Sequence, residues 1–198
     1  MKNITSLLIL GFLLLQQVSA LSSTPDSYLE AAFSLTDKWI IVDHKNNTHL
    51  YELDKEIQRQ AVMKIVMKLS GKDVPDTCRG EFADVDTTTW PCKYIEAALD
   101  TWYIAQNETF RPFDNITLTE AMKLVLKSKE IQKIQETDNW QEDYMMTAYE
   151  YGIIDEKYYN YNDFATRGWI FQVATATIEK EEEIKTKQEE QLISDEAL

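Results

Sequence analysis

The chain has 198 residues and a formal net charge of −14, which comes from 20 basic and 34 acidic side chains. Such a balance repels nucleic acid and anionic membrane surfaces, so it excludes partners that are attracted by the overall field. An anionic ligand would have to be held by local donors and cations, because the rest of the chain opposes it.

The first twenty residues have the pattern of a secretory signal peptide. Lys2 precedes the apolar run LLILGFLLL, and Val18-Ser19-Ala20 supplies small residues for cleavage. The apolar run is too short to span a bilayer comfortably, and no later stretch approaches ~18 apolar residues. We therefore expect residues 1–20 to be removed on export, which leaves enough chain for one domain. A retained N-terminal anchor is the alternative.

The remaining chain carries an internal repeat. Three segments start alike, with YLEAAF at Tyr28, YIEAAL at Tyr94 and YMMTAY at Tyr144. Tryptophan precedes the second and the third at the same spacing, as Trp90 and Trp140. An apolar pair or turn and a polar loop with one aromatic residue follow in each segment. The predicted repeats cover residues 22–75, 78–128 and 136–178.

Periodicity predicts two helices in each repeat. In AVMKIVMKL, the apolar residues Val62, Ile65, Val66 and Leu69 recur at helical spacing. One helix pair cannot bury its apolar stripe alone, but three pairs packed together can. The predicted fold class is therefore all-α, and the second helices are expected to begin at Ile57, Ile116 and Ala165.

The chain has two cysteines, Cys78 and Cys92. In an exported protein the default for such a pair is a disulfide, and a loop of about fifteen residues is worth ~3 kcal/mol in the chain-entropy model. Two reduced thiols are the alternative. Two cysteines cannot make a structural zinc site, and Asp43, His44 and His49 lie in a loop without fixed geometry. We therefore predict no metal and no cofactor.

The tail, residues 179–198, is highly charged and lacks aromatic residues. Glu, Lys and Gln favour helix, so one interpretation prolongs the last helix. The interpretation that we favour is a frayed or solvated extension.

The starts of the second helices suggest anion sites. Thr117-Leu118-Thr119-Glu120 is a predicted capping box, Thr166 is a predicted cap before Arg167, and Gln58 is a poorer cap before Arg59. The first amides of a helix lack internal partners and carry partial positive charge, so an arginine there adds a bidentate fork for a carboxylate. We predict anion binding at Arg59 and Arg167. The alternative for each arginine is an ion pair with an acidic neighbour.

These residues resemble the S-layer homology family. The middle repeat carries the likeness best, through Phe82, Asp84, Val85, Trp90, Tyr94, Ala98, Phe110, Pro112, Ile116, Thr117 and Glu120. The third keeps Trp140, Tyr144, Ala148, Gly152-Ile153-Ile154 and Thr166-Arg167, and the first keeps Tyr28, Ala32, Tyr51 and Ile57-Gln58-Arg59. The resemblance implies three helix–loop–helix repeats around a pseudo-threefold axis. It also implies that inter-repeat grooves bind anionic, often pyruvylated, cell-wall glycans.

The ligand-binding residues that the resemblance implies are Arg59, Arg167, Asp84, Trp90, Trp140 and Gly152. Trp90 and Trp140 either stack on a sugar ring or belong to the core, and Asp84 either accepts from ligand hydroxyls or caps the following turn. The chain also departs from the family pattern. Leu118 stands where an arginine belongs, Trp102 stands where the third repeat has Gly152, and Gly168-Trp169 replaces an Ala-Glu pair.

The leading hypothesis is a non-catalytic, secreted module that attaches to an anionic polysaccharide at a bacterial cell surface or cell wall. The alternative is a structural or protein-interaction module of the cell envelope that has lost glycan binding, with an envelope protein as partner. A secreted hydrolase has little support. The chain has no nucleophile elbow, phosphate loop or HExxH motif, and 34 carboxylates guarantee chance pairs.

Overall fold

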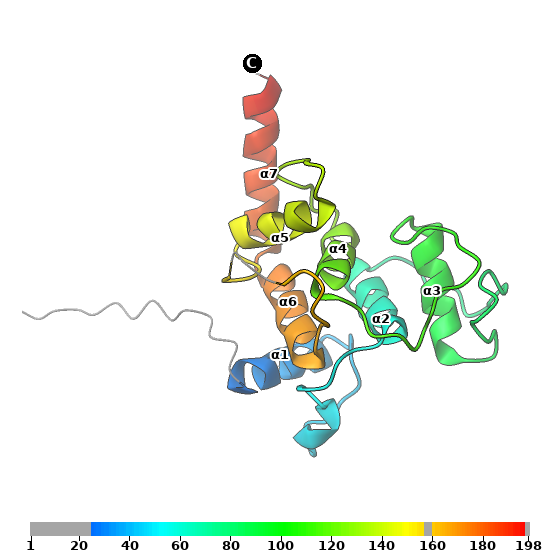
Figure 1. Ribbon diagram of the computed structural model, residues 1–198. Coiled ribbons are helices and arrows are strands. Elements are labelled where there is room, and N and C mark those ends of the chain that lie inside the picture. The colour runs from blue at the N-terminus through cyan, green and yellow to red at the C-terminus, as the bar shows by residue number, and fades with distance from the viewer. Residues whose placement is uncertain (1–24, 157–159, 197–198) are drawn as a thin grey trace, which may run out of the picture.

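The computed structural model describes residues 25–156 and 160–196, and this part of the chain is all-helical, without a β-strand (Figure 1). The predicted all-α class is therefore confirmed. The expected signal peptide, residues 1–20, lies outside the described residues. The helices are α1 (Pro25–Asp37), the 3-10 helix η1 (Thr48–Tyr51), α2 (Arg59–Ser70), α3 (Trp90–Asp100), α4 (Leu118–Ser128), α5 (Trp140–Glu150), α6 (Arg167–Glu179) and α7 (Glu181–Glu196).

Three helices contact one another at the centre of the molecule. These are α2, α4 and α6, and their inward faces bury the aliphatic side chains of Val66, Leu126 and Ile170. The other three helices pack around them, with α3 against α2, α5 against α4, and α1 against α6 (Figure 1). The first helix of each pair thus packs on the second helix of the preceding pair, and α1 closes the circle on α6.

A closed cycle of backbone hydrogen bonds joins the segments that lead into the central helices. The amide of Ile57 donates to the carbonyl of Ala165 at 2.9 Å, Ala165 donates to Ile116 at 2.9 Å, and Ile116 donates to Ile57 at 3.2 Å. Each of these residues is almost completely buried. Because their backbone polar groups bond to one another, the cycle is satisfied without water.

The cycle also explains why the central helices begin two residues later than expected. Arg59, Leu118 and Arg167 are the first helical residues, since the residues before them are extended and paired across the cycle. The predicted caps lie at these starts. Thr166 accepts from the amide of Trp169, and Thr117 forms the predicted capping box with Glu120.

The outer helices end in the same type of turn. The residues in left-handed conformation are Trp39 (φ 59°), Trp102 (φ 62°) and Gly152 (φ 66°). In all three turns the following amide donates back to the helix, from Ile40 to Leu35 at 3.0 Å, from Tyr103 to Ala98 at 2.9 Å and from Ile153 to Ala148 at 2.8 Å. This conformation favours glycine because a Cβ is crowded there, so two of the three turns hold a strained tryptophan.

The predicted disulfide between Cys78 and Cys92 is present, with the two Cα atoms 6.1 Å apart. It ties the connection between α2 and α3 to the first turn of α3. The Glu96 carboxylate holds the same connection, because it accepts from the backbone amides of Arg79 at 2.7 Å and Gly80 at 2.7 Å. The repeat boundaries at 22–75, 78–128 and 136–178 stay predictions.

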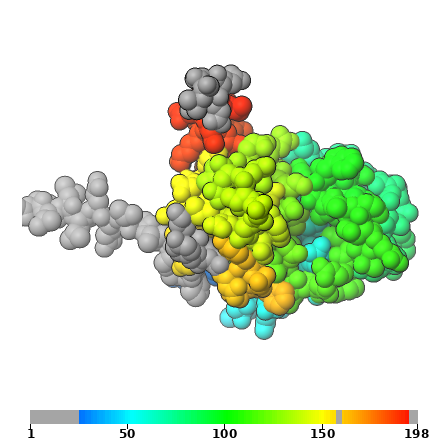
Figure 2. Space-filling view, turned by 45° about the horizontal axis from the view of Figure 1, so that its top comes forward, coloured from blue at the N-terminus to red at the C-terminus, as the bar shows by residue number. Residues whose placement is uncertain are grey.

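The acidic tail is helical over Glu181–Glu196, as α7, and projects from the body (Figure 2). Its base is attached, since Ile184 is buried and Glu181 pairs with Lys129 at 2.7 Å. Farther along, Leu192 and Ile193 are exposed. The tail is therefore helical, as the interpretation that prolongs the last helix expects, and its outer part is exposed to solvent, as the favoured interpretation of a solvated extension expects.

Candidate functional site

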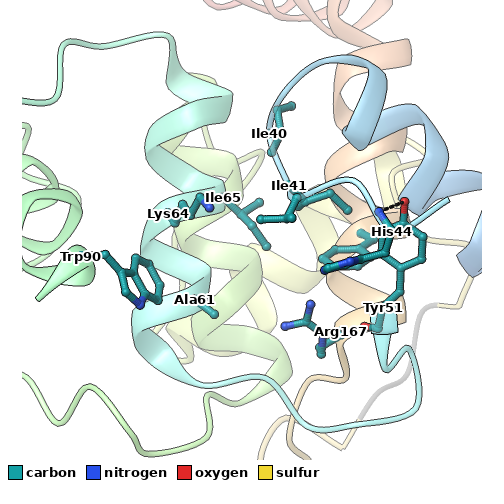
Figure 3. A pocket seen from close by; sticks show the side chains of 11 residues that line it. Ile40, Ile41, His44, Tyr51, Ala61, Lys64, Ile65, Trp90 and Arg167 are labelled. Carbon is teal, nitrogen blue, oxygen red and sulfur yellow. Dashed lines mark hydrogen bonds between the residues drawn. The ribbon is translucent and has the colours of Figure 1, made fainter. Parts of the chain in front are cut away.

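Two cavities lie where the central helices, the outer helices and their connections meet. Cavity 1 has a volume of about 180 Å³ and lies between α2, α6 and the connection after α1. Figure 3 shows Arg167 between α2 and the segment that carries Tyr51, with Lys64 and Trp90 on the α2 side. Ile40, Ile41 and Val42 add an apolar wall, and His44 completes the polar part of the lining.

Arg167 is held in cavity 1 by the backbone and a ring rather than by a carboxylate. Its Nε donates to the carbonyl oxygen of Tyr51 at 2.7 Å, and its guanidinium carbon lies 5.4 Å from the centroid of the Phe171 ring. Burial lowers the pKa of Arg167, against a smaller opposing effect of Glu52. No carboxylate among the described residues forms an ion pair with Arg167, so its terminal nitrogens can meet a ligand.

Cavity 2 is larger, with a volume of about 410 Å³, and lies between α2, α4 and the connection after α3. Its charged lining residues are Arg59, Glu120, Lys123 and Lys127, and its aromatic ones are Phe82, Trp102, Tyr103, Phe110 and Trp140. Arg59 Nε donates to the carbonyl of Phe110 at 3.1 Å, and the guanidinium carbon lies 5.0 Å from the centroid of that ring. Its Nη1 also lies 3.6 Å from Glu120 Oε1, so Arg59 both lines the cavity and has an acidic neighbour.

The two cavities contain the same constellation. Cavity 1 combines Arg167, the first residue of α6, with Lys64, the sixth residue of α2. Cavity 2 combines Arg59, the first residue of α2, with Lys123, the sixth residue of α4. Each cavity also has a tryptophan that is the first residue of an outer helix, Trp90 of α3 or Trp140 of α5. Lys64 Nζ lies 5.7 Å from the Trp90 ring centroid, and Lys123 Nζ lies 5.0 Å from that of Trp140.

The lysines were not identified from the sequence. Only their shared register after the helix starts could have pointed to them, because the lysine lies five residues after Arg59 in α2 and five after Leu118 in α4. Neither Lys64 nor Lys123 has a carboxylate partner within the described part of the chain. Each cavity therefore holds at least two cations beside an indole, inside a chain of net charge −14.

Burial lowers the pKa of two lysines in the cavities, Lys64 in cavity 1 and Lys127 in cavity 2. For Lys64 desolvation is the main cause, and the charge of Lys68 adds to it. For Lys127 desolvation again leads, and Lys123 adds to it. Lys127 is held in place by donating to the carbonyl of Trp102 at 2.6 Å. A bound anion would offset both the lost hydration and the mutual repulsion.

The structure brings some predicted site residues together and separates others. Arg167 and Trp90 line cavity 1, and Arg59 and Trp140 line cavity 2. Both tryptophans are exposed over about half of their surface, so they are not core residues. Asp84 and Gly152 are absent from the described lining of either cavity.

Asp84 lines neither cavity, and its carboxylate bonds to a distant segment rather than to the turn that follows it. Its two carboxylate oxygens accept from the backbone amides of Phe110 at 2.8 Å and Arg111 at 2.7 Å. It thereby fixes the segment whose Phe110 carbonyl holds Arg59. Gly152 lies beside Lys180, whose Nζ would be 2.9 Å from a Cβ at that position.

The third junction lacks the arginine. Leu118, which occupies the position of Arg59 and Arg167, is buried in the apolar core. Its neighbour Thr119 donates through its hydroxyl to the carbonyl of Tyr161 at 3.2 Å. Among the described residues, this junction thus has a buried leucine and a hydrogen bond where the other two have an arginine.

No family model matches the chain, and no curated protein matches it in sequence. In the described ranges, the one group of residues with metal-ligand spacing is Cys78, Cys92 and Glu96, and its two sulfurs are bonded to each other. None of the helices described here has the length and apolar character of a membrane span.

Proposed function

We propose that the protein is a non-catalytic, exported surface module that binds an anionic cell-wall glycan through cavities 1 and 2. One observation carries the proposal: each cavity combines at least two cations with a half-exposed tryptophan, although the chain as a whole is strongly acidic. Local cations of this kind bind an anion that the overall field would repel.

The lining of the cavities suits an acidic sugar. A guanidinium presents a planar fork to a carboxylate, and an ammonium adds a mobile point charge. The indole gives an apolar face on which the C–H face of a sugar ring can lie. Both arginines are already fixed by a backbone carbonyl, so little side-chain entropy is lost when they meet the ligand.

The repeat organisation and the S-layer homology relationship belong to the same proposal. Three observations support them: the cyclic hydrogen bonds of Ile57, Ile116 and Ala165, the circular packing of outer on central helices, and the matching left-handed turns. Residues at matching positions of the three helix pairs thus occupy matching places.

The alternative is a structural or protein-interaction module of the cell envelope. Leu118 favours it, because one of the three central helices begins with a buried leucine where the other two begin with an arginine. The projecting helix α7 favours it as well, since Leu192 and Ile193 are exposed on it. In that case the partner would be an envelope protein, and the cavities would not determine localisation.

Sedimentation with purified bacterial cell walls separates the two functions. The chain has four arginines, two in the cavities and two outside them, so a control with equal charge is available. We expect wild type to pellet with walls, and the pair Arg59→Ala and Arg167→Ala to stay in solution. The control pair Arg79→Ala and Arg111→Ala should pellet like wild type, provided that its thermal unfolding shows it to be folded.

Walls stripped of pyruvyl and other acidic groups test the ligand itself. Wild type should lose most of its binding to them, since the cations then have no partner. Equal pelleting of wild type and the Arg59/Arg167 double variant on intact walls would contradict the proposal and favour the protein-interaction module.

A further inference from the structure

Trp102 is an exposed aromatic residue in a strained position at the mouth of cavity 2. It is 82% exposed, has a φ of 62°, and lines the cavity together with Trp140. The described residues offer its indole no aromatic or cationic partner. The third turn of this type uses glycine, at Gly152, which adopts the conformation without strain. Packing therefore does not explain why tryptophan occupies this turn.

The turn fixes the backbone from which the Trp102 indole extends. The amide of Trp102 donates to the carbonyl of Leu99 at 3.0 Å, which joins the turn to α3. The carbonyl of Trp102 accepts from Lys127 Nζ at 2.6 Å, which joins it to α4. A residue anchored to both walls of the cavity is preorganised for a ligand.

Trp39 provides an internal comparison. It occupies the same kind of turn after α1, with a φ of 59° and an exposed fraction of 84%. The lining of cavity 1, however, begins at the next residue, Ile40, and does not include Trp39. Trp102 and Trp39 thus have the same backbone strain and the same exposure, but only Trp102 lines one of the two cavities.

The sizes of the cavities agree with this difference. Cavity 2, at about 410 Å³, falls within the range of pockets that hold drug-sized ligands, roughly 300–1,000 Å³, whereas cavity 1, at about 180 Å³, is smaller. Cavity 2 also has an indole on two walls, Trp102 and Trp140.

We propose that Trp102 forms a second sugar-stacking surface, so that cavity 2 binds two consecutive residues of the glycan and cavity 1 binds one. The anionic residue lies against Arg59 and Lys123 beside Trp140, and its neutral neighbour lies on the indole of Trp102. This inference rests on the proposed glycan binding. It adds a specificity that the arginines alone do not give, namely a preference for a disaccharide unit at one site.

Two probes test the inference. One is the methyl glycoside of a pyruvylated hexose, and the other is a disaccharide that adds one neutral hexose to the same residue. Titrations are followed by the indole N–H signals of Trp140 and Trp90 in NMR spectra of ¹⁵N-labelled protein, which report cavity 2 and cavity 1 separately. Trp102→Gly and Trp39→Gly are compared with wild type, and both should keep or raise the melting temperature, because glycine relieves the strained turn.

We expect the disaccharide to bind about tenfold more tightly than the monosaccharide at Trp140, and equally well at Trp90. Trp102→Gly should abolish the tenfold difference by lowering the affinity for the disaccharide to that for the monosaccharide, whereas Trp39→Gly should behave like wild type. A wild-type protein that does not distinguish the probes, or equal effects of the two glycine variants, would overturn the inference while glycan binding stands. Absence of binding of both probes to wild type would overturn the inference together with the proposed function.

Discussion

Cavities 1 and 2 have an arginine and a lysine at matching helix positions, but they differ in volume and in the side chains that line them. In both, an arginine at a helix start donates to the carbonyl of an aromatic residue, Tyr51 or Phe110. Cavity 1 has a volume of about 180 Å³ and an apolar wall, and its arginine has no carboxylate partner among the described residues. Cavity 2 is more than twice as large, and its arginine has Glu120 as a neighbour. If the proposed function holds, the matching helix positions would set where a ligand charge lies, and the connection after each outer helix would set how much ligand fits.

We expect the disulfide to affect cavity 1 more than cavity 2, because it joins the helix whose first residue, Trp90, lines cavity 1. Trp90 is two residues before Cys92, so the bond holds the helix end that carries this indole. Replacing both cysteines with alanine should lower the free energy of unfolding by ~3 kcal/mol, as expected for a loop of this length. Urea unfolding measures this loss.

In the folded fraction of that variant, the Trp90 indole signal should broaden while the Trp140 signal keeps its position. The oxidised wild-type protein under the same conditions is the control. Equal broadening of both signals would mean that the disulfide supports the whole fold and does not distinguish the cavities.

Gly168 is the second point at which the cavities differ. It follows Arg167, and a Cβ at this position would overlap the ring of Tyr28 and lie 2.9 Å from the carbonyl oxygen of Leu53. Gly168→Ala should therefore cost ~2 kcal/mol of stability, because the helix start must move away from α1. It should also weaken ligand binding at Trp90 more than at Trp140.

Gly71→Ala is the matched control for that substitution. Gly71 has a φ of 64°, but a Cβ added there would meet no atom within 4 Å, so only the conformational cost of about 1 kcal/mol applies. Thermal and urea unfolding of the two variants compare steric and conformational costs directly. A smaller loss for Gly168→Ala than for Gly71→Ala would contradict the close approach of α1 and α6.

Substituting Glu120, which lines cavity 2, is expected to give the smallest change in ligand affinity. Its carboxylate lies 3.6 Å from Arg59 and also accepts from the amide of Thr117 at 3.1 Å. Glu120→Gln keeps an oxygen for the capping bond but removes the competing charge, so an anion should bind cavity 2 about threefold more tightly. Glu108→Gln makes the same change of net charge on a residue that lines neither cavity. An equal gain in both variants would assign the effect to overall charge.

Local patterns predicted much of this molecule. Helical periodicity in AVMKIVMKL, the capping box at Thr117 and the cap at Thr166 depend on residues within a few positions of one another, and each is present. The disulfide followed from cysteine chemistry and the expected export. The two cavity arginines were found because a helix start has a recognisable sequence and a known electrostatic consequence.

The features that the sequence did not reveal depend on contacts between distant segments. The cycle of Ile57, Ile116 and Ala165 moves the helix starts by two residues, and no periodicity within one segment encodes it. The roles of Lys64 and Lys123 depend on Trp90 and Trp140, which lie on other helices, so no pattern within one helix indicates them. Gly168 looked like a departure from a motif, whereas it makes room for the ring of Tyr28.

The packing of α1 against α6 sets the order in which the chain can become native. When the ribosome has made only the first half of the protein, α1 has no surface on which to bury its apolar side, since α6 ends at Glu179. The three-way hydrogen-bond cycle is equally incomplete until Ala165 has been added. Nascent chains should thus stay open to proteases and chaperones until synthesis is nearly finished, and a truncation before α6 should release both ends of the circle at once.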